Sequence, residues 1–390
     1  MLALLGLAES LGMSLWFVGS AAAPQLRVSL ALSDAQVGWL TTAVQLGFVG
    51  GTALVALFNL ADLIPAARFF TGAALLGAAA NLLLLTAPDA NTLLVSRALT
   101  GAALAGVYPP AMKMAATWFR EQRGLAVGVI VGALTVGKAG PYLAHLLPGL
   151  SVATLVGTAS ASAVLAAALI GFGYREGPYP FPPRPFRLAL VGDVVRDRRW
   201  RLALGGYLGH MTELYAYWTW IPTFVAASLA AAPYTVTAPV GRRAALLGFA
   251  IIAVGGLGCV WGGWVADKIG RERLVIRALA ISGACCAGVG FAFGRSLWLL
   301  VPLALVWGFF IIADSAQFSV LVTESVPPHA VGTALSAQLC LGFLLTTLTI
   351  QTVPWIVTHV GWPRAFTALA LGPLAGIIAI RRLATTPAHA

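Results

Sequence analysis

The sequence carries little charge for its length. Of 390 residues, only 9% are Asp, Glu, Lys or Arg, whereas 59% are hydrophobic. Soluble domains carry about 25% charged residues, so this composition excludes a protein that is solvated mainly by water. Mean hydropathy is +0.88. Apolar runs long enough to cross a bilayer core of about 30 Å recur along the chain. Composition therefore predicts a polytopic membrane protein with no room for a separate soluble domain.

Cysteine is scarce, and the signatures of several enzyme classes are missing. The four cysteines all fall inside apolar runs, at Cys259, Cys285, Cys286 and Cys340. Their spacing fits neither a zinc site nor a disulfide framework, so we expect packing residues and no metal. The chain lacks a Gly-x-x-x-x-Gly-Lys-(Ser/Thr) loop, which argues against ATP-driven transport. It also lacks the catalytic set of an intramembrane enzyme, so we expect no enzyme activity and no cofactor.

Lysine is nearly absent, and arginine supplies most of the net charge of +11. The arginines lie between the hydrophobic runs rather than along one face, which favours membrane orientation over nucleic-acid binding. With both termini inside, the inner loops would hold sixteen basic residues and the outer loops five. This asymmetry predicts cytoplasmic termini. The Arg-for-Lys bias, together with abundant Ala and Gly, is typical of a GC-rich bacterial genome and predicts the bacterial inner membrane.

Twelve apolar runs alternate with turn residues such as Pro148-Gly149 and Pro327-Pro328. The first run lacks the basic region of a cleavable signal peptide, so we expect it to be a span. Only Gly294-Arg295-Ser296 separates the ninth and tenth runs, which leaves eleven spans as an alternative. Spans are predicted at 2–23, 37–58, 69–87, 92–116, 124–147, 150–173, 202–226, 243–265, 275–294, 297–322, 332–355 and 364–381.

The longest polar stretch, Tyr174–Arg201, is rich in Pro and Arg and separates six runs from six. We therefore expect an all-α membrane protein with an N-terminal six-helix bundle at 1–173 and a cytoplasmic linker at 174–201. A C-terminal six-helix bundle at 202–382 and a cytoplasmic tail at 383–390 complete the prediction. Similar loop sequences recur at matching places in the two halves, which indicates duplication.

The loop after the eighth run reads Gly263-Trp-Val-Ala-Asp-Lys-Ile-Gly-Arg-Glu-Arg273. It resembles the signature loop of the major facilitator superfamily, Gly-x-x-x-Asp-(Arg/Lys)-x-Gly-(Arg/Lys)-x-(Arg/Lys). The resemblance implies twelve transmembrane helices in two bundles and a latch that breaks and reforms during alternating access. The latch residues that it implies here are Gly263, Asp267, Lys268, Gly270, Arg271 and Arg273.

The corresponding loop of the first half keeps Asp62 and Arg68 but has Phe58 and Pro65 where the family has glycine. This departure leaves open whether the first latch works in the usual way. In the fourth run, Arg97-Ala-Leu-Thr-Gly101 resembles a family element whose arginine is linked to proton coupling in many exporters. The fifth run matches the Gly- and Pro-rich antiporter motif only in part, so it does not predict export.

Ionisable residues inside the spans are the candidates for function. Each costs roughly 2.5–3.5 kcal/mol at a helix centre, so each is expected to face a cavity or a partner. Helical phase places Arg97, Gly101 and Tyr108 on one face, because eleven residues make nearly three turns. In the family, spans 1, 4, 7 and 10 line the central cavity. The candidates for solute binding or proton coupling are Glu9, Arg97, Tyr108, Lys138, His210, Glu213, Tyr217, Asp314 and Gln317.

Two interpretations of these charges remain open. Basic groups fall mainly in the first half and acids in the second, which suits a polar, charged or zwitterionic solute and a proton relay through Glu213 and Asp314. Alternatively, the charges form structural ion pairs, for example Glu9 with Lys138.

The sequence predicts a secondary active transporter of a small polar or anionic solute, coupled to protons or to another solute and working by alternating access. We expect a monomer whose partners are the solute and the lipid bilayer. The alternatives are an exporter of amphipathic compounds, or a non-transporting sensor or assembly factor on the same fold.

Overall fold

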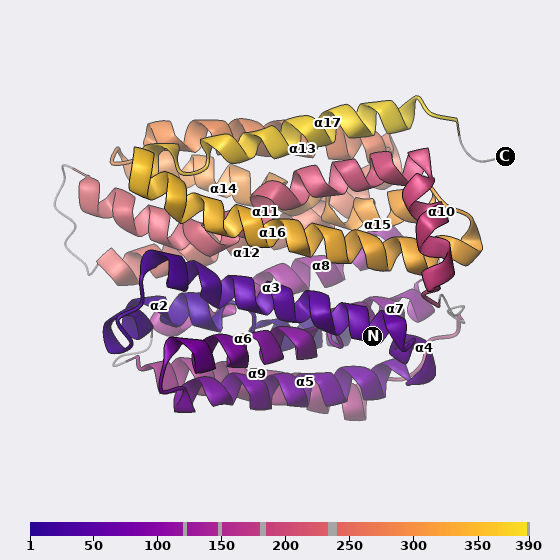
Figure 1. The fold of residues 1–390 in the computed structure, drawn as a ribbon, viewed down its shortest axis with the longest axis horizontal. Coiled ribbons are helices and arrows are strands. Elements are labelled where there is room, and N and C mark those ends of the chain that lie inside the picture. The colour runs from indigo at the N-terminus through magenta and orange to yellow at the C-terminus, as the bar shows by residue number, and fades with distance from the viewer. Residues whose placement is uncertain (120–122, 147–149, 180–184, 233–239, 388–390) are drawn as a thin grey trace.

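The computed structural model describes residues 1–119, 123–146, 150–179, 185–232 and 240–387, and within these ranges all regular structure is helical. The long helices lie side by side along one axis. In Figure 1 the N-terminal helices, indigo to magenta, form one half of the molecule, and the C-terminal helices, red to yellow, form the other. The predicted all-α class is therefore confirmed.

Two spans of the first half are interrupted. The first span consists of α1 (Leu2–Met13) and α2 (Val18–Ser29), joined by a turn at residues 14–17. The fourth consists of α6 (Ala90–Leu104) and α7 (Tyr108–Trp118), and α7 has prolines in its first turn, where no backbone N–H is needed. The other helices are α3 (Asp34–Leu57), the short α4 (Leu60–Leu63), α5 (Ala66–Leu82), α8 (Arg123–Ala139) and α9 (Val152–Gly173).

The second half begins earlier in the chain than the sequence predicts. Asp197 caps α11 by accepting a hydrogen bond from the backbone N–H of Trp200 at 2.8 Å, so this helix starts inside the predicted linker. The tenth span is interrupted at Asp314, between α14 and α15. The helices from the linker onward are α10 (Val191–Arg196), α11 (Arg198–Ala231), α12 (Val240–Ile269), α13 (Arg271–Gly288), α14 (Leu297–Ala313), α15 (Ser315–Thr323), α16 (Val331–Val360) and α17 (Leu371–Ala384).

Eleven helical segments of the described chain are long and apolar enough to cross a membrane, and α11 makes the twelfth span. Although it has 34 residues, α11 is not among the eleven. Its central turns carry His210 and Glu213 together with tyrosines and tryptophans, which lower the hydropathy of any window through them. The predicted twelve-helix architecture agrees with this arrangement.

The predicted latch loop at 263–273 is mostly helical. Helix α12 continues to Ile269 and α13 begins at Arg271, so Gly270 alone forms the connection. Its φ of +91° is a conformation that glycine adopts without a steric penalty.

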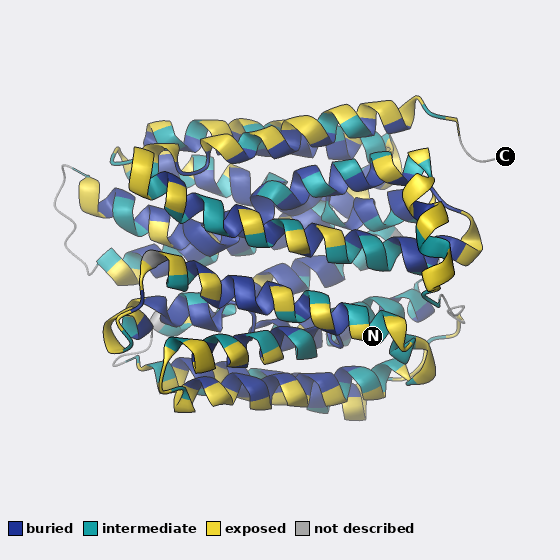
Figure 2. Ribbon diagram, in the orientation of Figure 1, coloured by how far each residue is buried: buried dark blue, intermediate teal, exposed yellow. Residues whose placement is uncertain are grey.

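The two halves meet along two seams, α8 against α12 and α3 against α16. In the first seam the backbones nearly touch, because a Cβ added to Gly132 would lie 2.7 Å from the carbonyl oxygen of Gly256. Small residues allow such close approach of membrane helices. Figure 2 shows buried residues concentrated toward the middle of the molecule and exposed ones along its outer helices.

Candidate functional site

A small cavity lies between the two halves, near the middle of the spans. Its volume is about 50 Å³, room for a few water molecules but far below the roughly 300–1,000 Å³ of a typical ligand pocket. Seven of the seventeen residues lining it are aromatic, and aliphatic side chains together with Met13 and Met211 make up most of the rest. The aromatic residues lining it are Trp16, Phe48, Tyr108, Tyr207, Tyr215, Trp218 and Phe343. In this conformation the halves are closed around a contracted cavity.

Lys138 is the charged residue on the cavity wall, and its side chain is 1% exposed. Its ammonium donates a hydrogen bond to the hydroxyl of Tyr215 at 2.5 Å. The same nitrogen lies 3.8 Å from the ring centre of Trp16 and 5.0 Å from that of Trp218. Aromatic faces attract a cation at such distances. Because Lys138 and Trp16 belong to the first half and Tyr215 and Trp218 to α11, this ammonium links the two halves.

Glu9 lies next to this wall but has no comparable partner. Its side chain is fully buried, and neither carboxylate oxygen has a hydrogen-bond partner among the described residues. The charged group that acts on it electrostatically is Lys138. The two share a level because the helices that carry them touch: a Cβ on Gly137 would overlap the carbonyl oxygen of Ser10. No ion pair forms between Glu9 and Lys138 within the described chain.

Arg97 lies inside the first bundle rather than on the cavity wall. One guanidinium nitrogen donates to the Oδ1 atom of Asn81 at 2.8 Å, and another donates to the carbonyl oxygens of Leu15 and Trp16, each at 2.8 Å. Those two carbonyls belong to the turn between α1 and α2, where the helical hydrogen bonds are interrupted. Arg97 therefore stabilises the break in the first span and positions Trp16, whose ring faces Lys138.

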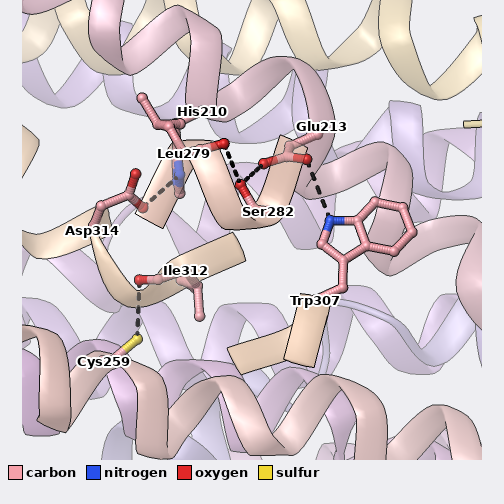
Figure 3. Close-up of polar contacts among 8 residues, drawn as sticks. All are labelled: His210, Glu213, Cys259, Leu279, Ser282, Trp307, Ile312 and Asp314. Atoms are coloured by element: carbon pink, nitrogen blue, oxygen red, sulfur yellow. Dashed lines mark hydrogen bonds and ion pairs between the residues drawn. The ribbon is translucent and has the colours of Figure 1, made fainter. Parts of the chain in front are cut away.

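The acids of the second half form a separate cluster, shown in Figure 3. Glu213 accepts hydrogen bonds from the hydroxyl of Ser282 at 2.5 Å and from the indole N–H of Trp307 at 3.3 Å. The Nδ1 atom of His210 lies 2.9 Å from Oδ1 of Asp314, at ion-pair distance but without hydrogen-bond geometry. All these groups are buried inside the second bundle, and none lines the cavity.

The remaining sequence-predicted candidates divide in the same way. Tyr108 lines the cavity. The hydroxyl of Tyr217 donates to the carbonyl oxygen of Ala304 at 3.1 Å, and Gln317 is buried in α15, so both lie within the second bundle. The structure thus brings Tyr108 and Lys138 to the cavity. Sequence reasoning missed Phe48 and Phe343, because phenylalanines recur throughout such a chain and nothing marks these two.

The two predicted latch loops have different partners. In the first half, Asp62 pairs with Lys113 at 3.2 Å, within the same bundle. In the second half, the carboxylate of Asp267 lies across the seam at Gly124, in the first turn of α8, where a Cβ would be 2.9 Å away. A negative charge is favourable at a helix N-terminus. Asp267 therefore fastens the end of α12 to the other half.

The other predicted latch residues make fewer contacts between the two halves. Gly263 packs closely against Gly124: a Cβ added to Gly263 would lie 2.5 Å from the carbonyl oxygen of Gly124. Lys268 lies over the ring of Trp264, 3.4 Å from its centre. Arg271 lies 3.8 Å from a carboxylate oxygen of Glu324. Arg68 and Arg273 are exposed.

A further connection at the same end runs through the linker. The backbone N–H of Phe186 donates to Oδ1 of Asn59 in the first half at 2.9 Å. The next N–H, that of Arg187, donates to the hydroxyl of Thr333 on α16, also at 2.9 Å. The linker therefore bridges the seam of α3 and α16 beside the latch loop that departs from the family pattern.

Twelve spans in two halves, packed around a cavity near the middle of the spans, form the architecture of a polytopic membrane transporter. The chain belongs to the Major Facilitator Superfamily, whose family model matches residues 4–349.

Solved structures share the fold. The structure of the superfamily transporter FucP in the outward conformation has a TM-score of 0.70 and 16% identity over 99% of both chains. A second FucP structure, of the E. coli fucose:proton symporter, has a TM-score of 0.69 and 15% identity, covering 99% of this chain and 98% of that one.

One sequence relative is a resistance protein. The puromycin resistance protein pur8 of Streptomyces alboniger is 38% identical over 120 residues, which is 30% of this chain and 23% of that protein. The chain therefore matches less than a quarter of the length of this relative.

Proposed function

We propose that this protein is a secondary active transporter of a small solute with an anionic group, held in the central cavity by Lys138. The carrying observation is the bonding of that ammonium. A lysine ammonium has three donors, and here its hydrogen-bond partner is the hydroxyl of Tyr215, supplemented by aromatic rings. An anionic oxygen supplies a stronger, charge-assisted bond. An anion would therefore bind to the ammonium N–H donors of Lys138 that the bond to Tyr215 does not use.

The cavity wall adds a preference for the body of the solute. Aromatic rings and methionines can cover an apolar or aromatic portion, while the hydroxyls of Tyr108 and Tyr207 can bond polar substituents. The solute class that fits is a small organic anion with an apolar portion. Transport proceeds by alternating access, in which the cavity widens toward one side of the membrane while the other side stays closed.

The closures at one end of the molecule are consistent with this cycle. Asp267 against α8 and the linker bonds of Asn59 and Thr333 hold the halves together at the end predicted to be cytoplasmic. Breaking them opens that end. The driving force is an ion gradient, and the residues available to bind a proton are the buried carboxyl groups of Glu9, Glu213 and Asp314.

Export of amphipathic compounds is the second candidate function. It is favoured by the aromatic wall of the cavity and by the partial match to a puromycin resistance protein. The two candidates differ in what Lys138 does: it binds the solute in the first, whereas in the second it only joins the halves.

A ligand screen by thermal unfolding of the purified protein distinguishes them. A ligand at a hundred times its Kd stabilises by about 2.7 kcal/mol. We expect stabilisation by organic anions in the wild type, retention in Lys138→Arg and loss in Lys138→Ala. Lys113→Ala is the matched control, because this lysine pairs with Asp62 outside the cavity. Stabilisation by cationic amphipathic compounds alone, unchanged in Lys138→Ala, contradicts the anion proposal and supports export.

A further inference from the structure

Glu9 and Lys138 lie at the same level of two touching helices, yet their charged groups do not pair. The backbones of α1 and α8 are in contact at Ser10 and Gly137, one residue away from each. The ammonium of Lys138 nevertheless reaches across the cavity to Tyr215 of the other half. Glu9 is left fully buried, with both oxygens unbonded among the described residues.

A fully buried carboxyl group without hydrogen-bond partners needs either a cation beside it or a proton. An ionised carboxylate without hydrogen bonds or a cation is too costly to hold in an apolar interior, so it takes up a proton instead. The helices packed against α1 are α7, α8 and α9. Among the described side chains of these helices, Lys138 and Tyr108 act on Glu9 or are acted on by it, Lys113 is bonded to Asp62, and α9 has no ionisable residue. Within that described set, Lys138 is the cation that could neutralise an ionised Glu9.

We propose that Glu9 is the proton-binding site of the transporter, and that Lys138 exchanges between Glu9 and the anionic group of the solute. This inference rests on the proposed function. The flexible four-carbon stem of lysine allows the ammonium to move between the two positions. The conformation described here has the side-chain arrangement of the loaded state: Lys138 is turned toward the side of the cavity where the anion would bind, and Glu9 is the group that would carry the proton.

Charge balance then sets the coupling. When the site is loaded, Lys138 pairs with the anion and Glu9 carries a proton. When it is unloaded, Lys138 pairs with ionised Glu9. Both states are neutral overall, whereas an anion without a proton, or a proton without an anion, leaves an unpaired buried charge. The proton enters with the solute from one side and leaves on the other, so one proton accompanies each monovalent anion.

The geometry favours Glu9 over the other buried acids. Glu213 is held by Ser282 and Trp307, and Asp314 lies against His210. Both pairs of contacts lie within the second bundle and away from the cavity wall. A proton on either residue changes no charge next to the solute, whereas a proton on Glu9 decides whether Lys138 is available.

Infrared difference spectroscopy of the full chain in lipid, between acid and alkaline pH, tests this without any solute. The wild type should lose one protonated-carboxyl C=O band on alkalinisation. That band should be missing in Glu9→Gln, should shift in frequency in Glu9→Asp and should be unchanged in Glu213→Gln. In Lys138→Gln it should persist at alkaline pH, because ionised Glu9 would have no cation. Glu9→Asp keeps a carboxyl group and guards against a folding defect in the amide variant.

Two results would overturn the inference: a band that persists unchanged in Glu9→Gln, or a band lost only in Glu213→Gln. Its failure is separable from failure of the proposed function. If the ligand screen finds anions that depend on Lys138 but the Glu9 band does not titrate, only the proton site is wrong. If the band titrates but no anion binds, the solute assignment is wrong.

Discussion

Replacing Arg97 by methionine distinguishes a structural arginine from a coupling one. In the structure its guanidinium donates three hydrogen bonds, to Asn81 and to the carbonyl oxygens of Leu15 and Trp16. Methionine fills similar space but leaves all three acceptors without this donor. Each buried acceptor left unbonded costs about 1–3 kcal/mol, which gives about 3–9 kcal/mol in total. Removing a buried charge recovers several kcal/mol of that, so we expect a net loss of about 3 kcal/mol.

The assay is unfolding of the purified protein in mixed micelles by increasing SDS, with Lys113→Met as the matched control. Lys113 lies on the same span and pairs with Asp62 near the surface, an interaction worth about 0–1 kcal/mol. Arg97→Lys keeps the charge but not the planar fork, so it should fall between the two. The structural assignment is refuted if Arg97→Met is as stable as Lys113→Met. If such a stable variant also loses proton-coupled transport, the role implied by the family resemblance is the correct one.

Two further predictions concern the surface connections. Asn59 has a φ of +51°, and its Oδ1 atom accepts a hydrogen bond from the backbone N–H of Phe186. Asn59→Gly allows the same backbone conformation but removes the acceptor, so trypsin should cleave the linker faster than in the wild type or in Asn59→Asp. Equal cleavage rates would contradict the bridging role of this bond. Asp89 caps α6, and the N–H of Thr92 donating to it lowers the pKa of its carboxyl group. Its stabilising effect is therefore present above the ordinary Asp pKa and lost as the pH falls through the lowered one. The non-titrating cap in Asp89→Asn should reduce the fall in thermal midpoint at acid pH, and an unchanged profile contradicts this.

The existence of the helices could be predicted from the sequence because long apolar runs have few alternatives in a membrane. Helix α11 shows that hydropathy alone does not identify every span. Its His210, Glu213 and aromatic residues depress its hydropathy, and only its length and its place after the linker identify it as a span. The motif around Gly270 was recognised, but the loop expected between spans ending at 265 and beginning at 275 is reduced to one residue. A single glycine with positive φ is enough to reverse direction between α12 and α13.

Which way each side chain faces could not be predicted, because helical phase is lost at a break. Arg97 and Tyr108 share a face on a continuous helix, as the spacing predicted. In the structure α6 ends at Leu104 and α7 begins at Tyr108, so Tyr108 reaches the cavity while Arg97 turns into the first bundle. The break has a local signal in Pro109 and Pro110, which lie in the first turn of α7 and cannot continue the preceding helix. The direction in which Arg97 turns depends instead on its contacts with the turn of the first span, which no local pattern around Arg97 records.

The aromatic contacts across the cavity connect its small size to the chemistry of the solute. Phe48 and Phe343, from opposite halves, have ring centres 4.5 Å apart, and Trp16 lies 5.7 Å from Tyr215. A solute can enter only if such pairs separate. The seam of α8 and α12 has backbone packed against backbone at its glycines, so no side chain there can move aside to make room. Each aromatic pair contributes about 0.5–1.5 kcal/mol beyond its buried area. A solute with a flat apolar portion regains those contacts on the separated rings, whereas a small inorganic anion regains only the bond to Lys138. On the proposed anion function, we therefore expect the closed aromatic wall to favour organic anions over inorganic ones, because contacts must be broken before either can bind.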